Sequence, residues 1–447
     1  MKPSLTLMAI LITVSTATRA QVVPVAAEPT GLPVSGTLHY DLRYSQIAQF
    51  GGGTWGDVQR SIASGDASYA NISKRLPFSM QYGGGYGWTL SGTPTAGNVF
   101  QHLSVSQGIV GRKWSLAASD NVSYTFETPT IGFTGIPGTG EPISGSGTTT
   151  TPDQTILTLN TRTLDNIATI GYIQKLNYAT TLNLDGTWGE MRFIDNNGQN
   201  TEMLTANTGI TRRLDARVSV SGQYSFTRFN FSGSGYSTQA NTAQFGVTRK
   251  WNRKLTTAVT AGPAWIASSG VPNPGSLVLP STTTLFLSAS VSYQQRRGAA
   301  SVNYSHGTNG GAGYLLGANI SNINANYSRA FGKNLTIGVT GSYIRTTSLL
   351  AAELEYACSI DNVTYICLVP LNITPVTNAR YGGVQATRKL GRYFNAFASY
   401  TAIDQSSNLQ TSAPNTPLSS NATILNGLNQ VISFGIGYSP RETHLKK

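Results

Sequence analysis

The sequence is poor in charged residues, in cysteine and in histidine. Only 11% of the 447 residues are charged, whereas soluble domains carry about 25%. Two cysteines are too few for a disulfide scaffold, and four scattered histidines argue against a metal enzyme. Disorder is excluded as well, because disordered segments have few aromatic residues and this chain has 21 Tyr and 15 Phe. The composition therefore excludes an ordinary soluble domain, and we expect neither a metal nor a cofactor.

Long apolar runs are also scarce, and the one that exists lies at the N-terminus. Residues 5–14 form an apolar run of signal-peptide length after the positive Lys2, and small residues follow, as they do at a cleavage site before Gln21. The run is shorter than the about 20 residues that a membrane-spanning helix needs. We therefore predict a signal peptide at residues 1–20, followed by a periplasmic N-terminal segment at residues 21–36.

The remaining chain lacks a helical period of 3.6 residues and instead alternates apolar with polar residues. Successive side chains of a β-strand face opposite sides, so a wall between an apolar and a polar environment produces strict alternation. In the first such segment Leu38 and Leu42 share one face, while Asp41 and Arg43 share the other. The chain is therefore predicted to be all-β. The same pattern recurs at 216–227, 285–294, 322–327 and 335–343.

Strand length and face chemistry favour a membrane barrel over a soluble sandwich. Sandwich strands average about 5–6 residues, but these segments approach the about 9–11 residues of a barrel crossing. Their polar face is Ser, Thr, Asn, Gln and Gly, which suits a wet lumen behind a wall that faces lipid. We predict a transmembrane antiparallel up-and-down β-barrel over residues 37–438, with about eighteen strands, an even number as in bacterial barrels. Sixteen is the alternative count, and a basic tail follows at 439–447.

Eight short basic turns join the predicted strands in pairs. The other connections are longer and rich in Gly, Ser, Thr or Pro, at 128–152, 268–282, 347–378 and 404–427. Outer-membrane barrels have short periplasmic turns and long outer loops, so we place the basic turns and both termini on the periplasmic side. Much of the net charge of +12 thus lies at one rim, and no nucleic-acid partner is expected. The turns contain Lys74-Arg75-Leu76, Arg112-Lys113-Trp114, Gln174-Lys175-Leu176, Arg212-Arg213-Leu214, Arg249-Lys250-Trp251, Arg296-Arg297-Gly298, Arg329-Ala330-Phe331 and Arg388-Lys389-Leu390.

Several segments resemble those of a known family. The closing strand 432–438 (ISFGIGY) is similar to the C-terminal insertion signal of outer-membrane barrels, although residues 439–447 continue past its aromatic end. Together with the repeated R-[RK]-[LW] hairpins and the segments 306–313 and 391–400, it resembles the β-barrel porins of Gram-negative bacteria, in particular a group associated with exopolysaccharide systems. The resemblance implies an outer-membrane barrel with a transport function, and it carries no site residues over to this chain.

Four charged residues on the predicted polar faces are candidates for the lumen. They are Asp41, Arg43, Asp185 and Arg217. Opposed charges in a pore set a transverse field that selects solutes, whereas charges that pair with each other only brace the wall. We favour bracing. Since the rest of the polar face is Ser, Thr, Asn and Gln, we expect weak ion selectivity and tolerance of neutral solutes.

The two cysteines and two of the histidines are the remaining candidate sites. Cys358 and Cys367 lie in one predicted outer loop of an exported chain, which favours a disulfide between them. His102 and His306 lie on β segments without a strand-to-helix nucleophile turn, so we expect wall residues and not catalytic ones. The chain is therefore not expected to be an enzyme.

The sequence supports three functions, the first of which it favours most. The first is a passive, porin-like channel for small hydrophilic solutes in the outer membrane. The second is the barrel component of surface exopolysaccharide export or assembly, with periplasmic or polysaccharide-export proteins docked on the basic turns. The third is a structural or adhesion barrel with a closed lumen. All three share outer-membrane lipid as a partner.

Overall fold

The computed structural model describes most of the chain from the first predicted strand onward. The described residues are 36–51, 57–71, 73–92, 98–126, 162–194, 199–232, 235–269, 281–310, 315, 317–349, 352–360, 363–373, 375–408, 426–440 and 443–444. The predicted signal peptide and most of the N-terminal segment lie outside these residues, so their assignment stays a prediction. In the described ranges no helix is long and apolar enough to cross a membrane.

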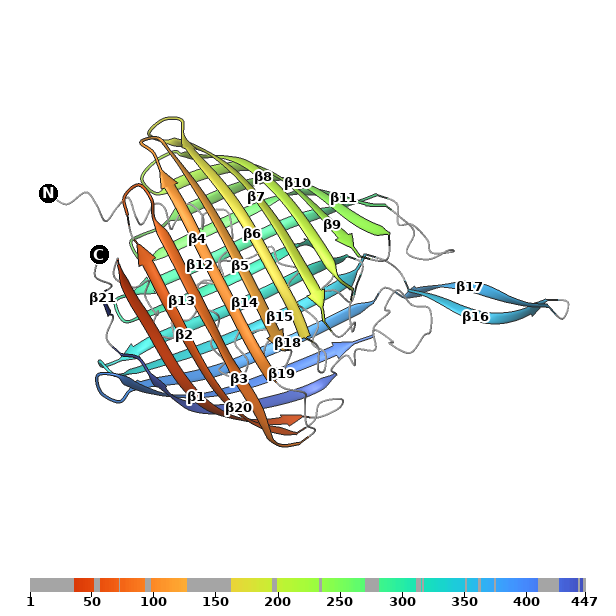
Figure 1. The fold of residues 1–447 in the computed structure, drawn as a ribbon. Helices are drawn as coiled ribbons and strands as arrows, with labels where there is room; N and C mark the ends of the chain where they lie inside the picture. Colours follow the sequence, from red (N-terminus) through yellow and green to blue (C-terminus); the bar gives the residue numbers. More distant parts are fainter. Residues whose placement is uncertain are drawn as a thin grey trace.

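Eighteen strands form one closed antiparallel barrel (Figure 1), which confirms the predicted fold and the higher of the two strand counts. The structure also contains a separate hairpin (β16 and β17) and a two-residue strand (β21). The strands are β1 (Thr37–Gly51), β2 (Val58–Asn71), β3 (Phe78–Ser91), β4 (Asn98–Val110), β5 (Trp114–Phe126), β6 (Arg162–Lys175), β7 (Thr180–Phe193), β8 (Thr201–Arg213), β9 (Val218–Phe231), β10 (Tyr236–Lys250), β11 (Leu255–Ser269), β12 (Thr282–Gln295), β13 (Gly298–Asn309), β14 (Ala318–Phe331), β15 (Leu335–Ser348), β16 (Ala352–Ile360), β17 (Val363–Ile373), β18 (Val376–Lys389), β19 (Phe394–Ser407), β20 (Gly427–Tyr438) and β21 (Thr443–His444).

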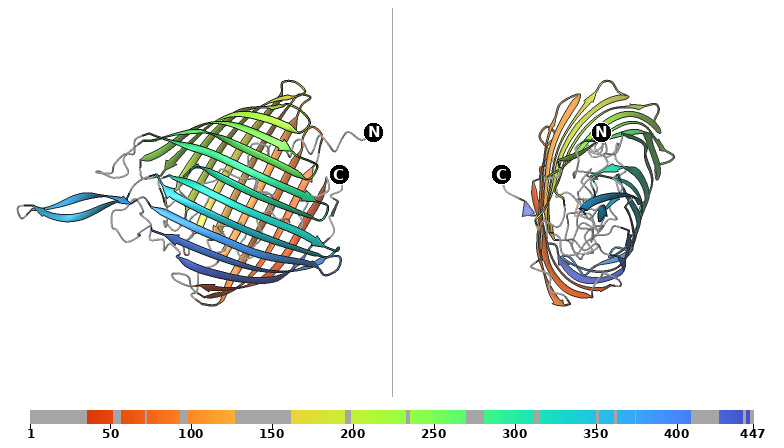
Figure 2. Two further views of the ribbon diagram at one scale, coloured as in Figure 1. Left: turned by 180° about the vertical axis from the view of Figure 1, so that it is seen from behind. Right: turned by 90° about the vertical axis from the view of Figure 1, so that its right-hand side faces the viewer.

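The barrel closes between its first and last long strands. β1 pairs with β2 on one side and with β20 on the other, where Leu42 lies opposite Tyr438 and Gly51 lies opposite Asn429. Every other barrel strand pairs with its neighbours in the chain, except that β15 pairs with β18 because the β16–β17 hairpin is inserted between them. A view along the barrel axis shows the resulting oval ring of strands (Figure 2). Closure removes the free strand edges whose backbone groups would otherwise be unpaired.

The two faces of each strand meet different environments. On β1 the side chain of Leu42 is 56% exposed, while its neighbour Asp41 on the other face is 5% exposed. The exposed side is apolar all around the barrel. A surface in contact with water would be largely polar, whereas a surface in contact with lipid must be apolar. Because only closed barrels and helices satisfy their backbone hydrogen bonds in hydrocarbon, this chain is an outer-membrane β-barrel. Exposed apolar side chains include Ile170, Ile210, Phe245, Val259, Leu285, Val302, Ile323, Val339, Val384 and Ile436.

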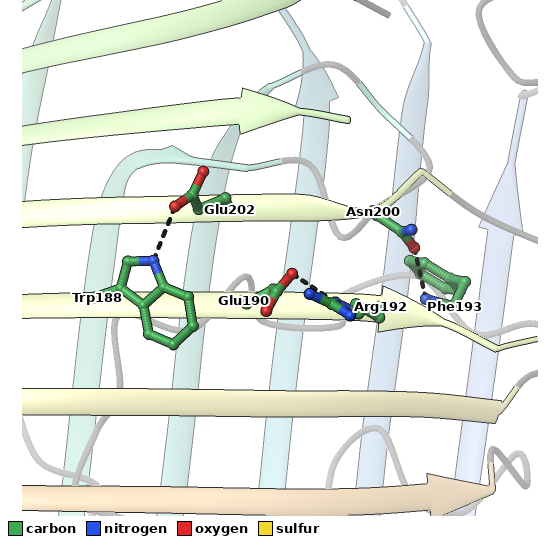
Figure 3. A network of polar contacts seen from close by, with 6 residues as sticks. All are labelled: Trp188, Glu190, Arg192, Phe193, Asn200 and Glu202. Carbon is green, nitrogen blue, oxygen red and sulfur yellow. Dashed lines mark hydrogen bonds and ion pairs between the residues drawn. The ribbon is translucent and has the colours of Figure 1, made fainter. Parts of the chain in front are cut away.

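A polar network on the lipid-facing side marks where β7 and β8 leave the apolar band (Figure 3). The indole Nε1 of Trp188 donates a hydrogen bond to Oε1 of Glu202 at 2.9 Å. Nε of Arg192 donates to Oε1 of Glu190 at 2.5 Å. These residues alternate with buried ones near the long-loop end of their strands, so the charged groups lie at the edge of the apolar band, where headgroups replace hydrocarbon.

The short turns at the other end are built on a repeated hydrogen-bond pattern. In the turn before β9, the Leu214 N–H donates to the Val218 carbonyl at 2.9 Å, and the Asp215 carboxylate accepts the backbone N–H groups of Arg217 and Val218. These hydrogen bonds hold the pKa of Asp215 below its ordinary value. Asn177 and Asn252 cap their own turns in the same way. A leucine or tryptophan followed by Asn or Asp thus specifies the turn.

The connection between β15 and β18 contains a hairpin that was not predicted from the sequence. Within the segment treated as one outer loop, β16 and β17 form a separate two-stranded sheet that extends from the long-loop end of the barrel (Figure 1). Cys358 lies opposite Tyr365 and Cys367 lies opposite Tyr356, so the two cysteine positions are offset by two residues in the register. The cysteine side chains lie outside the described part of the chain, and the disulfide stays a prediction.

One interruption of the ladder occurs between β10 and β11. Pro263 has no backbone N–H to donate, and the registered pairs stop at Thr242 and resume at Phe245. The neighbouring Gly262 lets the two backbones approach, because a Cβ at this position would collide with the Ala243 carbonyl oxygen. A glycine is therefore required here by the close approach of β10.

Gly262→Ala should destabilise the folded barrel by about 1–3 kcal/mol, because the added methyl group must displace backbone and not a flexible side chain. Gly382→Ala on β18 is the matched control, since a Cβ there meets nothing within 4 Å. The measurement is urea unfolding of the refolded barrel, followed by the mobility shift between folded and heated protein on gels. Equal unfolding midpoints for the two variants would show that Gly262 has no such role.

Candidate functional site: the inner wall of the barrel

The inner wall is lined by hydroxyl and amide side chains that pair across neighbouring strands. Successive inward positions of adjacent strands lie directly opposite each other, so Ser, Thr and Asn there meet their own kind at hydrogen-bond distance. The two side chains of such a pair form a hydrogen bond with each other. Their remaining donor and acceptor atoms are left for water or solute. The wall is therefore polar but carries little charge. The side-chain pairs are Ser79–Ser106 at 2.7 Å, Thr169–Thr187 at 3.3 Å, Thr205–Thr227 at 3.3 Å, Asn303–Asn324 at 3.1 Å and Ser399–Ser433 at 2.6 Å.

Asp41 and Arg43 lie on the inner face of β1. The Arg43 guanidinium is 3.6 Å from Oδ2 of Asp41, and Nε2 of His39 is 3.4 Å from Oδ1 of the same carboxylate. Asp66 of β2 lies directly opposite Asp41 in the register. Both ion pairs are formed within β1, and the Asp66 carboxylate lies opposite Asp41 on the neighbouring strand. The bracing of the wall by these charges stays a prediction.

Asp185 and Arg217 are separated by the fold. Asp185 lies on the inner face of β7, and its Oδ2 accepts a hydrogen bond from Asn207 Nδ2 of β8 at 2.5 Å. Arg217 is not on a strand: it precedes β9 in the turn 214–217 and is exposed at the rim. The expectation that Arg217 continues the polar face of a strand misjudged the start of β9, because the Asp215 cap forms the turn up to Val218.

Large inward side chains lie flat against the wall, over glycines of the next strand. The ring of His102 on β4 lies beside Gly83, its register partner on β3. Phe100 lies over Gly85 in the same way, and a Cβ on that glycine would be 2.5 Å from its ring. His306 is on the other face of its strand, where Nδ1 contacts Ser321 Oγ at 2.8 Å. The two histidines considered for catalysis therefore do not share a site.

The long-loop end of the wall carries apolar clusters that were not predicted from the sequence. Met203, Phe229 and Tyr236 are 1–2% exposed and pack together on the inner side of β8–β10. The signal is present in the sequence: along β9 the apolar residues first occupy the lipid-facing parity and then change to the inner parity at Phe229, while the charged Arg228 takes the outer face. This inversion marks where a strand passes from hydrocarbon into the headgroup region.

The connection between β13 and β14 reaches this cluster from another part of the barrel. A Cβ on Gly310 would be 3.0 Å from the Phe229 ring and 3.2 Å from Thr201 Cγ2, and a Cβ on Gly317 would be 3.2 Å from Oγ1 of Thr238. β13 and β14 are not neighbours of β8–β10 in the ring. The ends of this connection therefore lie inside the outer mouth of the lumen, which they narrow.

No metal-binding arrangement occurs in the part of the chain that the structure describes, where no group of three or more His, Cys, Asp or Glu side chains is placed to hold an ion. The chemistry available to the inner wall is hydrogen bonding by hydroxyl and amide groups, with charged groups at β1–β2 and the Asp185 carboxylate on β7.

No family model and no curated protein matches the chain. Solved barrels that it resembles include OccK2 (OpdF) of Pseudomonas aeruginosa, with 10% identity and a TM-score of 0.44 over 92% of this chain and 98% of that one. OccAB3 of Acinetobacter baumannii has 10% identity and a TM-score of 0.41 over 90% and 99% of the two chains. The FrpB iron transporter of Neisseria meningitidis has 8% identity and a TM-score of 0.42 over 90% and 81%. A likeness at this level assigns no function.

The contact between the β13–β14 connection and β8 can be trapped by a disulfide. Cysteines introduced at Gly310 and Thr201, with Cys358 and Cys367 replaced by serine, should cross-link under mild oxidant, because the Gly310 Cβ direction points at Thr201. The measurement is the mobility of the unfolded protein on gels with and without reductant. A Gly310→Cys/Asn303→Cys pair serves as the control, since Asn303 lies lower on the wall and faces β14. Cross-linking of the control alone would contradict the placement of this connection.

Proposed function

We propose that this barrel is a passive channel that carries small hydrophilic solutes across the outer membrane. The observation that supports it is the inner wall, where hydroxyl and amide side chains pair across strands from β3 to β20. Such a wall exchanges hydrogen bonds with water and with neutral polar solutes at little cost. It holds no solute tightly, as passive conduction requires.

The size of the ring supports the same function. Small barrels of about eight strands are filled by their own side chains, whereas barrels of about 16–18 strands have room for an aqueous channel. Here the largest side chains of the β3–β4 wall lie flat over Gly83 and Gly85 and so take up little of the interior. The narrow point of the path is then the outer mouth, where Gly310 lies against Phe229.

The charged groups of the wall support weak ion selectivity. Asp41 is paired with Arg43 and lies 3.4 Å from His39, whereas Asp185 is a single carboxylate that accepts a hydrogen bond from the neutral amide of Asn207. Paired charges produce a weaker field in the lumen than charges of one sign on facing walls. Arg217, at the rim, is outside this set.

Single-channel recordings test the proposal. The parent protein should open in planar bilayers and show a reversal potential near zero in a salt gradient. Arg43→Ala should shift the permeability ratio toward cations by up to about fivefold, because it leaves the Asp41 carboxylate without its guanidinium partner and one extra charge across water is worth about 1 kcal/mol. Arg217→Ala is the matched control and should leave the ratio unchanged, because Arg217 lies in the turn before β9.

The absence of openings at any voltage would retire the channel and favour the structural barrel with a closed lumen. Strong ion selectivity of the parent protein would contradict the expected weak selectivity but would leave the channel function in place.

Export of a surface polysaccharide is the second candidate, and the inner mouth supports it. The last residues of four strands place Lys175, Arg213, Lys250 and Lys389 on the inner parity of the periplasmic rim. A ring of positive charge there would attract an acidic polymer toward the lumen from the periplasm. Loss of surface polysaccharide on deletion of the gene, together with block of the current by acidic oligosaccharide added on the periplasmic side only, would favour this function over general solute passage.

A further inference from the structure

The short-turn rim is almost exclusively cationic. Within the eight turns and the adjoining strand ends there is one acidic residue, Asp215. Its carboxylate accepts two backbone N–H groups of its own turn and interacts with Arg217 and Arg249, so it is one negative charge among many positive ones. All of the Lys and Arg side chains in these segments are exposed. They are Lys74, Arg75, Arg112, Lys113, Lys175, Arg212, Arg213, Arg217, Arg249, Lys250, Arg253, Lys254, Arg296, Arg297, Arg329, Lys333, Arg388, Lys389 and Arg392.

Strand parity divides these cations between two surfaces. At the end of β10, Arg249 lies opposite Val218 on the lipid-facing side, while the next residue, Lys250, lies opposite Thr256 on the inner side. The ends of β8 and β18 repeat this arrangement, and Arg329 of β14 shares the lipid-facing parity. We call the outward set the arginine belt; it consists of Arg212, Arg249, Arg329 and Arg388.

Each belt arginine lies between apolar side chains on the same face. Along β10, Val247 is 39% exposed on the membrane side of Arg249, and Trp251 is 47% exposed on its periplasmic side. Arg329 lies in the same way between Tyr327 and Phe331. Apolar surface therefore continues beyond each guanidinium toward the periplasm. Such surface is more stable in contact with lipid than with water, which is consistent with guanidinium groups at the depth of the headgroups on this rim.

Two of the belt arginines are held against aromatic rings. The guanidinium carbon of Arg249 is 3.8 Å from the centre of the Trp251 ring, and that of Arg329 is 5.3 Å from the centre of the Phe331 ring. A stacked guanidinium keeps its N–H groups free at its edge and is oriented in advance for two parallel hydrogen bonds to a phosphate. The ring itself lies at the interface, as expected of a membrane-anchoring aromatic residue.

We infer that the arginine belt binds the phosphate groups of anionic glycerophospholipids in the inner leaflet of the outer membrane. A soluble acidic polymer fits the belt less well, because it would first meet the exposed rings of Trp251 and Phe331 and would have to reach past them. The inward cations, Arg213, Lys250 and Lys389, are open to the periplasmic water and are the ones that such a polymer would contact. This inference depends on the barrel and its membrane orientation and is independent of what the lumen carries.

The test compares two variants that each remove four positive charges from the same rim. The belt variant carries Arg212→Gln, Arg249→Gln, Arg329→Gln and Arg388→Gln. The control variant carries Lys175→Gln, Arg213→Gln, Lys250→Gln and Lys389→Gln, which lie on the inner parity. Both are refolded, checked by the mobility shift of folded against heated protein, and analysed by native mass spectrometry from mixed phosphatidylglycerol and phosphatidylcholine micelles. Single Arg249→Gln is kept as a second variant in case the fourfold change prevents refolding.

The parent and the control variant should retain phosphatidylglycerol over phosphatidylcholine. The belt variant should lose about fivefold in phosphatidylglycerol affinity at each site, as expected for one arginine near a lipid surface, with phosphatidylcholine retention unchanged. Equal losses in both variants would assign the effect to the total charge of the rim and overturn the inference. So would unchanged lipid retention in the belt variant, or loss of its binding to soluble polyglutamate with lipid retention intact.

Discussion

The structure depends on one constraint, which is that every backbone N–H and C=O group within hydrocarbon must find a partner in the protein. The pairing of β1 with β20 meets this constraint by joining the two ends of an eighteen-strand sheet. Once the ladder is closed, each residue can face only lipid or lumen, and neighbouring residues face opposite ways. The apolar wall, the polar lumen and the separation of Arg249 from Lys250 at the rim are consequences of that closure.

Closure also explains where the sequence can vary its chemistry. Along β9 the apolar residues occupy the lipid side within the membrane and the inner side above it, where Phe229 packs and Arg228 faces out. The exchange requires no change in backbone geometry, because alternation continues through it. Alternation acts in the same way at the short-turn end, where one Arg-Arg or Arg-Lys pair places one cation on the lipid-facing side and the next on the inner side. Both placements come from one hairpin without a dedicated domain.

The predicted fold followed from signals that are local and repeated. Alternation at Leu38–Tyr44 and its recurrences identified strands, and the basic turns gave the pairing and the count of eighteen. The positions of individual side chains were harder to predict. Asp41 and Arg43 lie on the inner face, as their alternation implied, but Arg217 lies in a turn because Asp215 caps the residues before β9. The β16–β17 hairpin was not predicted, because strict alternation is required only where a membrane imposes two environments, and this hairpin extends beyond the barrel.

The sequence by itself determined the class of fold and the solvent on each side of the wall, because period two is a property of neighbouring residues. Only the tertiary structure decided which distant residues meet. Gly310 lies against Phe229 although 81 positions separate them along the chain, and His102 lies flat because Gly83 faces it across a strand pair. Contacts of this kind depend on register and on the path of a connection through space. Neither the register nor the path of a connection can be read from the alternation of apolar and polar residues.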